Sequence, residues 1–166
     1  TANERMDWLL EKATELGAST LLPITAERSV LKLKGERSDK KLAHWQAIAV
    51  AASEQCGRNQ VMAVTPPLTL AQALTAIPTA QPNKPRWILS LAAGTKPLSA
   101  AFEDAKKNAQ SLPLEVTVLS GPEGGLSPSE EAQALAAGFV PVSLGPRVLR
   151  AETAPVAVLS VLGALI

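Results

Sequence analysis

The sequence has few of the residues that build metal centres and disulfides. Its 166 residues include one cysteine, Cys56, and one histidine, His44. One cysteine cannot form an internal disulfide, and the two residues together are too few for a Cys-rich or His-rich metal site. No G-x-S-x-G turn is present to carry the serine of a Ser-His-Asp triad. We therefore expect no metal, and we expect His44 to be solvated or hydrogen-bonded and Cys56 to lie on the buried face of a helix.

Long apolar runs and a strong excess of one charge are also absent. No run of about 18 apolar residues occurs, and residues 1–5 do not begin a secretion signal, which argues against membrane-spanning and secreted proteins. The single cysteine fits a reducing compartment, so we expect a cytoplasmic protein with no membrane partner. The formal net charge is only +1, so contact with nucleic acid would have to use a local basic patch.

Apolar runs of strand length alternate with amphipathic stretches of helix length along the whole chain. This alternation predicts one α/β domain spanning residues 1–166. Strands are expected at 20–25, 61–64, 86–91, 114–120 and 139–143. Helices are expected from Asn3 to Gly17, from a cap at Ser38 to Gly57, at 69–76, at 98–110, from a cap at Ser127, and at 151–166. The start at Ser127 is the sharpest, because Pro at the first helical position and a glutamate two residues later complete a capping box.

The last expected helix is apolar on every side. From Pro155 onward, Ser160 is the only residue with a polar side chain. Such a helix must be covered on more than one side, yet it is too short to cross a bilayer. Two interpretations stay open: a central core helix of the monomer, or the interface of an obligate homodimer.

Two unusual loops each connect an expected strand to an expected helix. The glycine-rich turn, residues 121–125, reads GPEGG, and the arginine loop, residues 144–153, carries Arg147, Arg150 and Glu152. Parallel α/β sheets bind ligands at the carboxyl ends of their strands, so the two loops are candidates for one ligand site. Neither loop has the spacing that binds dinucleotides or nucleoside triphosphates, so these are not the favoured ligands.

The two loops resemble the signature of the ribosomal RNA small subunit methyltransferase E family, in the SPOUT superfamily of S-adenosylmethionine-dependent RNA methyltransferases. Three further segments fit the family in the same order: EKATELG at 11–17, ERS at 27–29 and SEQCGR at 53–58. The resemblance implies a SPOUT-type α/β fold with a mostly parallel sheet flanked by helices. It also implies a deep C-terminal trefoil knot in about residues 114–166, although unthreaded chains are the rule in proteins. A homodimer formed through the knot and the last helix is implied as well.

The implied reaction is S-adenosylmethionine-dependent methylation of N3 of a specific uridine in 16S ribosomal RNA. The implied cofactor site joins the loop after the third expected strand to the glycine-rich turn and the arginine loop, with glycines allowing close backbone approach. Its candidate residues are Leu91, Gly121, Pro122, Glu123, Gly124, Gly125, Leu144, Gly145, Val148 and Leu149. Relatives often place a more polar residue near Leu91, so its expected contact is mainly through the backbone.

Methylation at uridine N3 requires loss of an imide proton and stabilisation of charge on the flanking carbonyl oxygens. We assign Arg150 and Arg147 to charge stabilisation and nucleotide orientation, and Glu152 or Glu123 to the role of base or positioning carboxylate. Which carboxylate acts stays open. The RNA-binding candidates are basic residues in or near the charged segment 28–41, together with one beyond it: Arg28, Lys32, Lys34, Lys40, Lys41 and Arg58.

Members of this family usually carry a small β-rich, PUA-like RNA-binding domain before the segment that matches Thr1. That domain is missing from this sequence, which also has no tyrosine and only 3% aromatic residues to stack on bases. We expect the chain to bind cofactor and dimerise but to methylate RNA poorly by itself. The alternatives are a related methyltransferase acting on transfer RNA or large-subunit RNA, and a catalytically silent dimeric RNA-binding module.

Overall fold

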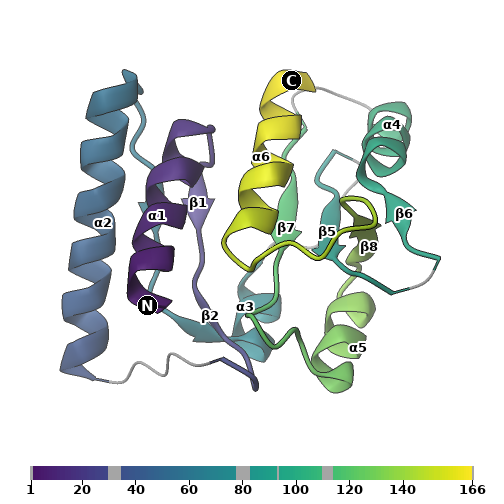
Figure 1. Cartoon of the computed structure of the whole chain (residues 1–166), viewed down its shortest axis with the longest axis horizontal. Helices are drawn as coiled ribbons and strands as arrows, with labels where there is room; N and C mark the ends of the chain where they lie inside the picture. Colours follow the sequence, from purple (N-terminus) through teal and green to yellow (C-terminus); the bar gives the residue numbers. More distant parts are fainter. Residues whose placement is uncertain (1, 30–34, 78–82, 93, 110–113, 166) are drawn as a thin grey trace.

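The computed structural model describes residues 2–29, 35–77, 83–92, 94–109 and 114–165. Helices and short strands alternate along the chain (Figure 1). Every strand pair in these ranges is parallel. The predicted α/β fold with parallel strands flanked by helices is confirmed.

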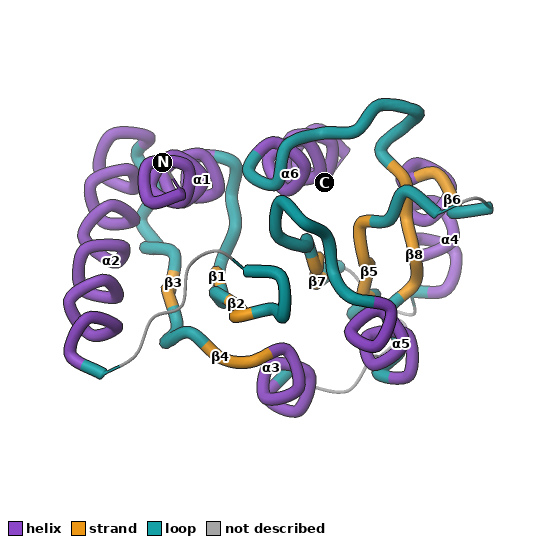
Figure 2. The backbone as a smooth tube through the Cα atoms, turned by 60° about the horizontal axis from the view of Figure 1, so that its bottom comes forward, coloured by secondary structure: helices purple, strands orange, loops and turns teal. Residues whose placement is uncertain are grey.

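The N-terminal half packs two helices beside two short strand pairs. The helices α1 (Ala2–Glu15) and α2 (Glu36–Cys56) lie side by side (Figures 1 and 2) and enclose a core that includes Leu10 and Trp45. Strand β1 (Thr20–Leu21) pairs with β3 (Ala63–Val64), and β2 (Ile24–Thr25) pairs with β4 (Leu68–Thr69), which leads into α3 (Leu70–Ala76). The expected strand 20–25 is interrupted at Pro23, whose ring nitrogen has no hydrogen to donate to a ladder.

The C-terminal half contains a four-stranded sheet in the order β6-β8-β5-β7. Its strands are β5 (Arg86–Leu89), β6 (Lys96–Pro97), β7 (Thr117–Leu119) and β8 (Val140–Ser143). Trp87 and Ile88 on β5 point to opposite faces because side chains alternate along a strand. Trp87 packs under α4 (Leu98–Asn108) and α6 (Thr153–Leu165), whereas Ile88 packs under α3 and α5 (Pro128–Ala136). Helices therefore cover both faces.

The start of α5 agrees with its sequence signature. The Ser127 hydroxyl accepts a hydrogen bond from the Glu130 backbone, and the Glu130 carboxylate accepts one from the Ser127 backbone, with Pro128 at the first helical position. The expected cap at Ser38 is wrong, because α2 already begins after Gly35, whose φ of 58° few other residues adopt. Asn3 lies inside α1, one residue past its start. The strands β4 and β6 were not expected, since two residues are too few to show a periodic pattern.

Helix α6 is buried on one side and open on the other. Val158 and Leu162 belong to the core under α4, as the core-helix interpretation expects. Val161 and Leu165 are 39% and 51% exposed. Within the described residues, no helix is both long and apolar enough to cross a membrane.

Candidate functional site

A cleft of about 600 Å³ opens at the carboxyl ends of β5, β7 and β8. These three strands are neighbours in the sheet, so the loops that follow them lie next to one another. Ser90 follows β5, the glycine-rich turn follows β7 and the arginine loop follows β8, and all three segments line the cleft. The two unusual loops therefore face the same space.

Most of the candidate cofactor-binding and catalytic residues line the cleft. It is lined by the cofactor-binding candidates Leu91, Gly121, Pro122, Glu123, Gly125, Leu144, Val148 and Leu149, and by the catalytic candidates Arg147, Arg150 and Glu152. Gly124 and Gly145 do not line it. Leu91 and Val148 are 64% and 79% exposed, so this edge of the cleft offers apolar side chains to a ligand.

Local geometry favours glycine at three positions of the turn. A Cβ on Gly121 would lie 3.1 Å from the Leu126 backbone nitrogen, and Gly125 has a φ of +70°. A Cβ on Gly124 would lie 3.2 Å from the Cβ of Arg28. The neighbouring loop that carries Arg28 therefore favours glycine at position 124. A contact between Gly124 and a cofactor stays a prediction.

Arg5 of α1 reaches the cleft from far away in the sequence. Its Nη1 lies 3.2 Å from Oε1 of Glu123, 118 positions later, and its Nε lies 3.8 Å from Oε1 of Glu152. Arg5 therefore connects the glycine-rich turn to the arginine loop through two ion pairs. Nothing in the sequence predicts this role, because one arginine on an amphipathic helix carries no signal of its distant partners.

The two candidate carboxylates lie in different surroundings. The Glu152 side chain is 13% exposed, and within the described part of the chain its Oε2 is buried without a hydrogen-bond partner. The Glu123 side chain is 41% exposed and forms the shorter ion pair with Arg5. A buried acceptor without a partner is costly unless a ligand supplies the donor. Glu152 is therefore the better placed of the two to accept from a ligand.

The basic candidates lie in separate places. The Nη1 of Arg28 donates to the Gly124 carbonyl at 3.1 Å, beside the glycine-rich turn. Lys40 and Lys41 lie on the first turns of α2, where Lys40 is exposed. Lys32 and Lys34 lie outside the described residues.

Arg58 has a structural role that its sequence position does not predict. Its Nη1 donates to the carbonyl oxygens of Thr14 and Ala18 at 2.6 and 2.9 Å. Carbonyl groups at a helix end lack partners within the helix, so this guanidinium caps the end of α1. We therefore leave Arg58 out of the proposed RNA surface.

The lone histidine and cysteine take no part in the cleft. His44 Nε2 lies 2.8 Å from Oδ2 of Asp7 and links α2 to α1, in agreement with a hydrogen-bonded helix residue. Cys56 is exposed, so its expected burial is wrong. The buried face of α2 ends instead at Ser53, whose hydroxyl donates to the Ala49 carbonyl at 2.8 Å. No group of metal-ligating side chains occurs in the portion of the chain that the structure describes.

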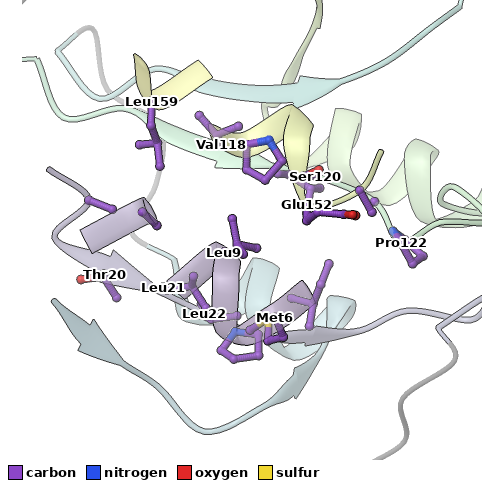
Figure 3. Close-up of a pocket in the computed structure, with 18 of the residues that line it drawn as sticks. Met6, Leu9, Thr20, Leu21, Leu22, Val118, Ser120, Pro122, Glu152 and Leu159 are labelled. Atoms are coloured by element: carbon purple, nitrogen blue, oxygen red, sulfur yellow. The ribbon is translucent and has the colours of Figure 1, made fainter. Parts of the chain in front are cut away.

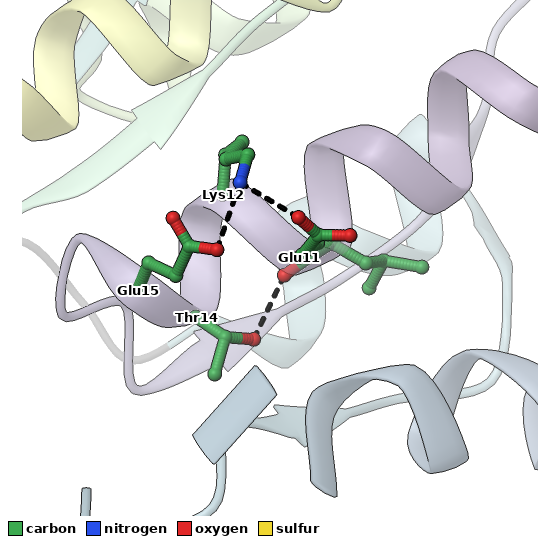
Figure 4. A network of polar contacts seen from close by, with 5 residues as sticks. Glu11, Lys12, Thr14 and Glu15 are labelled. Atoms are coloured by element: carbon green, nitrogen blue, oxygen red, sulfur yellow. Dashed lines mark hydrogen bonds and ion pairs between the residues drawn. The ribbon is translucent and has the colours of Figure 1, made fainter. Parts of the chain in front are cut away.

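The EKATELG segment supports α1 and does not line the cleft. Lys12 Nζ lies 2.6 Å from Glu11 and 2.8 Å from Glu15 (Figure 4), and these hydrogen bonds raise the pKa of Lys12 above its ordinary value. On the buried side, the Thr14 hydroxyl donates to the Leu10 carbonyl at 2.8 Å. The motif therefore stabilises the helix that presents Arg5.

A second cavity of about 400 Å³ lies between α1, the first strands and α6 (Figure 3). Its walls are mostly apolar and include Met6, Leu9, Leu22 and Leu159. The residues that line both cavities are Arg5, Ser120, Gly121, Pro122, Glu123, Ala151 and Glu152. The glycine-rich turn is thus a shared wall.

Glu130 is a buried carboxylate at the start of α5. Burial alone would raise its pKa, but hydrogen bonds from the backbone of Ser127 and Glu27, the Ser127 hydroxyl and the charge of Arg28 outweigh burial. They hold the pKa of Glu130 below its ordinary value of 4.5. The carboxylate is therefore ionised at neutral pH.

The fold and the cleft together define a class of protein: a parallel α/β domain whose strand-end loops enclose a ligand-sized space with arginines and carboxylates on its walls. Comparison with known families makes the class specific. The model of the RNA methyltransferase domain family matches residues 1–163, and the chain belongs to this family.

The chain is similar to curated proteins named ribosomal RNA small subunit methyltransferase E. It is 37% identical over 158 residues to the Synechocystis protein and 34% identical over 157 residues to the Bacillus subtilis protein. Each match covers 95% of this chain, but 48% of the first relative and 60% of the second. The chain therefore spans about half to three fifths of these relatives, and the resemblance inferred from the motifs is confirmed.

Solved structures agree with this relationship. A ribosomal RNA small subunit methyltransferase E from Neisseria gonorrhoeae, bound to S-adenosyl methionine, has a TM-score of 0.83 and 38% identity, covering 98% of this chain and 62% of that one. A putative methyltransferase from Legionella pneumophila, in complex with the cofactor SAM, has a TM-score of 0.82 and 36% identity, covering 97% of this chain and 61% of that one.

Proposed function

We propose that this chain is the catalytic part of an S-adenosylmethionine-dependent methyltransferase that modifies N3 of a specific uridine in 16S ribosomal RNA. The observation that carries the proposal is the cleft in which the glycine-rich turn and the arginine loop meet. The solved relatives bound to S-adenosylmethionine support the choice of cofactor.

The cleft fits this cofactor in size and in chemistry. Its volume of about 600 Å³ lies within the range of small-molecule sites. Leu89, Leu91 and Val148 on its walls offer apolar surface to an adenine ring, while the turn presents backbone groups to polar atoms. The bound cofactor supplies an electrophilic methyl group. The residues proposed to hold it are Leu91, Gly121, Pro122, Glu123, Gly124, Gly125, Leu144, Gly145, Val148 and Leu149.

Glu152 is the proposed acceptor of the uridine N3 proton. Among the described residues its buried Oε2 has no donor, so it can take a hydrogen bond from the imide N–H and then the proton. Glu123 is more exposed and is paired with Arg5, so we assign it a positioning role.

Arg147 and Arg150 are the proposed electrostatic groups. As the imide proton leaves, negative charge develops on the two carbonyl oxygens of the uracil ring, and guanidinium donors lower its energy. Both arginines line the cleft, and the guanidinium group of neither has a hydrogen-bond or ion-pair partner within the described ranges. Their donors are therefore available to a nucleotide.

The proposed RNA contacts lie in two described places, beside the cleft and at the start of α2. Arg28 lies at the glycine-rich turn, and Lys40 and Lys41 lie at the start of α2. Lys32 and Lys34 belong to the same basic segment. Lysine and arginine contacts to phosphates supply most of the sequence-independent affinity for nucleic acid.

The knot and the homodimer remain part of the proposal. We propose one domain over residues 1–166, in which about residues 114–166 form the trefoil knot. The open side of α6, with Val161 and Leu165 exposed, supports a dimer interface that continues from the knot. The enzyme would act in the cytoplasm, where ribosomal RNA is assembled into subunits.

The alternatives are a methyltransferase for transfer RNA or large-subunit RNA and a silent RNA-binding module. Both loops are intact and share one cleft, which favours an active enzyme over a silent module. The test is methyl transfer from labelled S-adenosylmethionine, with enzyme in excess, to 16S RNA, 23S RNA and transfer RNA in parallel. We expect N3-methyluridine in 16S RNA alone by nucleoside mass spectrometry. Label in another RNA, or none, would contradict the proposal.

A further inference from the structure

The loop formed by residues 26–29 is hydrogen-bonded to the start of α5. Oε1 of Glu130 accepts a hydrogen bond from the Glu27 backbone N–H at 2.8 Å, and Oε2 accepts one from the Ser127 backbone N–H at 2.9 Å. The loop is closed by its own bonds, because the Ala26 N–H donates to the Ser29 hydroxyl oxygen at 2.9 Å. One buried carboxylate therefore joins two segments that are about a hundred positions apart.

The hydrogen-bonded loop 26–29 positions the side chain of Arg28. Arg28 follows Glu27 directly, and its Nη1 donates to the Gly124 carbonyl at 3.1 Å. The close approach is possible because Gly124 has no Cβ. A guanidinium has five N–H donors, so an exposed Arg28 keeps donors for a further partner. The neighbours of Gly124 in the turn, Glu123 and Gly125, both line the cleft.

We propose that Glu130 is a positioning residue for RNA binding, which holds Arg28 against the glycine-rich turn so that its guanidinium meets an RNA phosphate beside the cleft. The inference rests on the proposed function, because it takes RNA as the ligand. A carboxylate is required at this position, since each of its oxygens accepts from a different backbone N–H. The amide of a glutamine would direct its own N–H groups at one of these two donors.

The test is a double-mutant cycle on binding of protein-free 16S ribosomal RNA. We expect Glu130→Gln to weaken RNA binding about fivefold, and Arg28→Ala to weaken it by at least as much. Both should reduce the slope of log affinity against log salt by about 0.7 to 0.9, the value of one phosphate contact. In the Arg28→Ala background, Glu130→Gln should change RNA affinity by less than about twofold, because residues that act through each other are not additive.

Two further variants make the cycle decisive. Glu103→Gln on α4, a glutamate with a 58% exposed side chain away from the cleft, should leave RNA affinity and salt slope unchanged. Ser29→Ala loosens the same loop without touching α5, and it should reproduce the effect of Glu130→Gln if that variant folds poorly. An equal loss from Glu130→Gln with and without Arg28, or no loss from either loop variant, would overturn the inference.

Calorimetry with S-adenosylmethionine separates this inference from the proposed function. We expect the wild-type chain and the Glu130→Gln variant to bind the cofactor with affinities within about threefold of each other. A wild-type chain that binds RNA but not the cofactor would contradict the proposed function and leave the cycle valid as a test of Arg28 placement.

Discussion

Arg5 at the N-terminal end of α1 and Glu123 in the glycine-rich turn form an ion pair, with Nη1 and Oε1 3.2 Å apart. The same guanidinium lies 3.8 Å from Glu152 in the arginine loop. The loops at the carboxyl ends of the sheet are therefore completed by a helix from the other end of the chain.

Arg5→Ala should reduce methyl transfer much more than stability. The Arg5 and Glu123 side chains are 44% and 41% exposed, and such pairs contribute less than about 1 kcal/mol to folding. Loss of their connection should misplace both carboxylates, and we expect a roughly tenfold slower single-turnover rate. Lys84→Ala is the matched control, because it removes an ion pair with Glu115 away from the cleft. A large loss of unfolding free energy with an unchanged rate would contradict this role.

Glu152→Gln should slow methyl transfer by at least about a hundredfold, the usual contribution of a general base. Cofactor affinity should stay within about threefold, because the carboxylate is assigned to the uridine proton. Glu123→Gln makes the same change of side chain in the neighbouring loop. It should slow methyl transfer by about tenfold or less. Single-turnover rates and calorimetry measure both quantities, and equal losses of rate from the two variants would reject the assignment.

Gly121→Ala should weaken cofactor binding at least about tenfold. The new methyl group would lie 3.1 Å from the Leu126 backbone nitrogen, so the turn, which forms part of the cleft wall, has to shift by a few tenths of an ångström. Gly163→Ala adds the same group on α6, where the nearest atom is 3.8 Å away. Calorimetry should show normal affinity for the control, and normal affinity for both variants would remove the turn from the cofactor site.

Acid should weaken the contribution of Glu130 to stability. Because its pKa is lower in the folded chain than its ordinary value of 4.5, the ionised form stabilises the fold at every pH above that value. The contribution is lost as the pH falls through the lower, folded pKa. The unfolding free energy of wild type should exceed that of Glu130→Gln by about 1 to 3 kcal/mol at pH 7 and converge with it in acid. A difference in unfolding free energy that grows toward low pH would contradict a lowered pKa of Glu130.

The sequence predicted the elements whose signals are local. The capping box at Ser127 and Glu130 involves neighbours in the chain, and the structure contains it. The periodic apolar face of α2 predicted the burial of Trp45 and Ala49 but extended one turn too far, to Cys56. Strand-end position alone placed the glycine-rich turn and the arginine loop at one cleft, because the strands before them are parallel.

Contacts between distant segments could not be predicted from the sequence. Nothing near Arg5 in the sequence indicates its ion pair with Glu123, and nothing near Arg58 indicates that its guanidinium caps the end of α1. The reason for a glycine at position 124 also depends on Arg28, which a loop from another part of the chain brings beside it. Such partners are set by the packing of the whole domain.

In the proposed function, the loops after β5, β7 and β8 together form one cofactor site. The most direct test titrates the chain with S-adenosylmethionine by calorimetry and follows amide hydrogen exchange in residues 120–126 and 144–149. We expect saturable binding of one cofactor per chain, with slower exchange in both segments. Absence of saturable binding, or slower exchange confined to other parts of the chain, would contradict it.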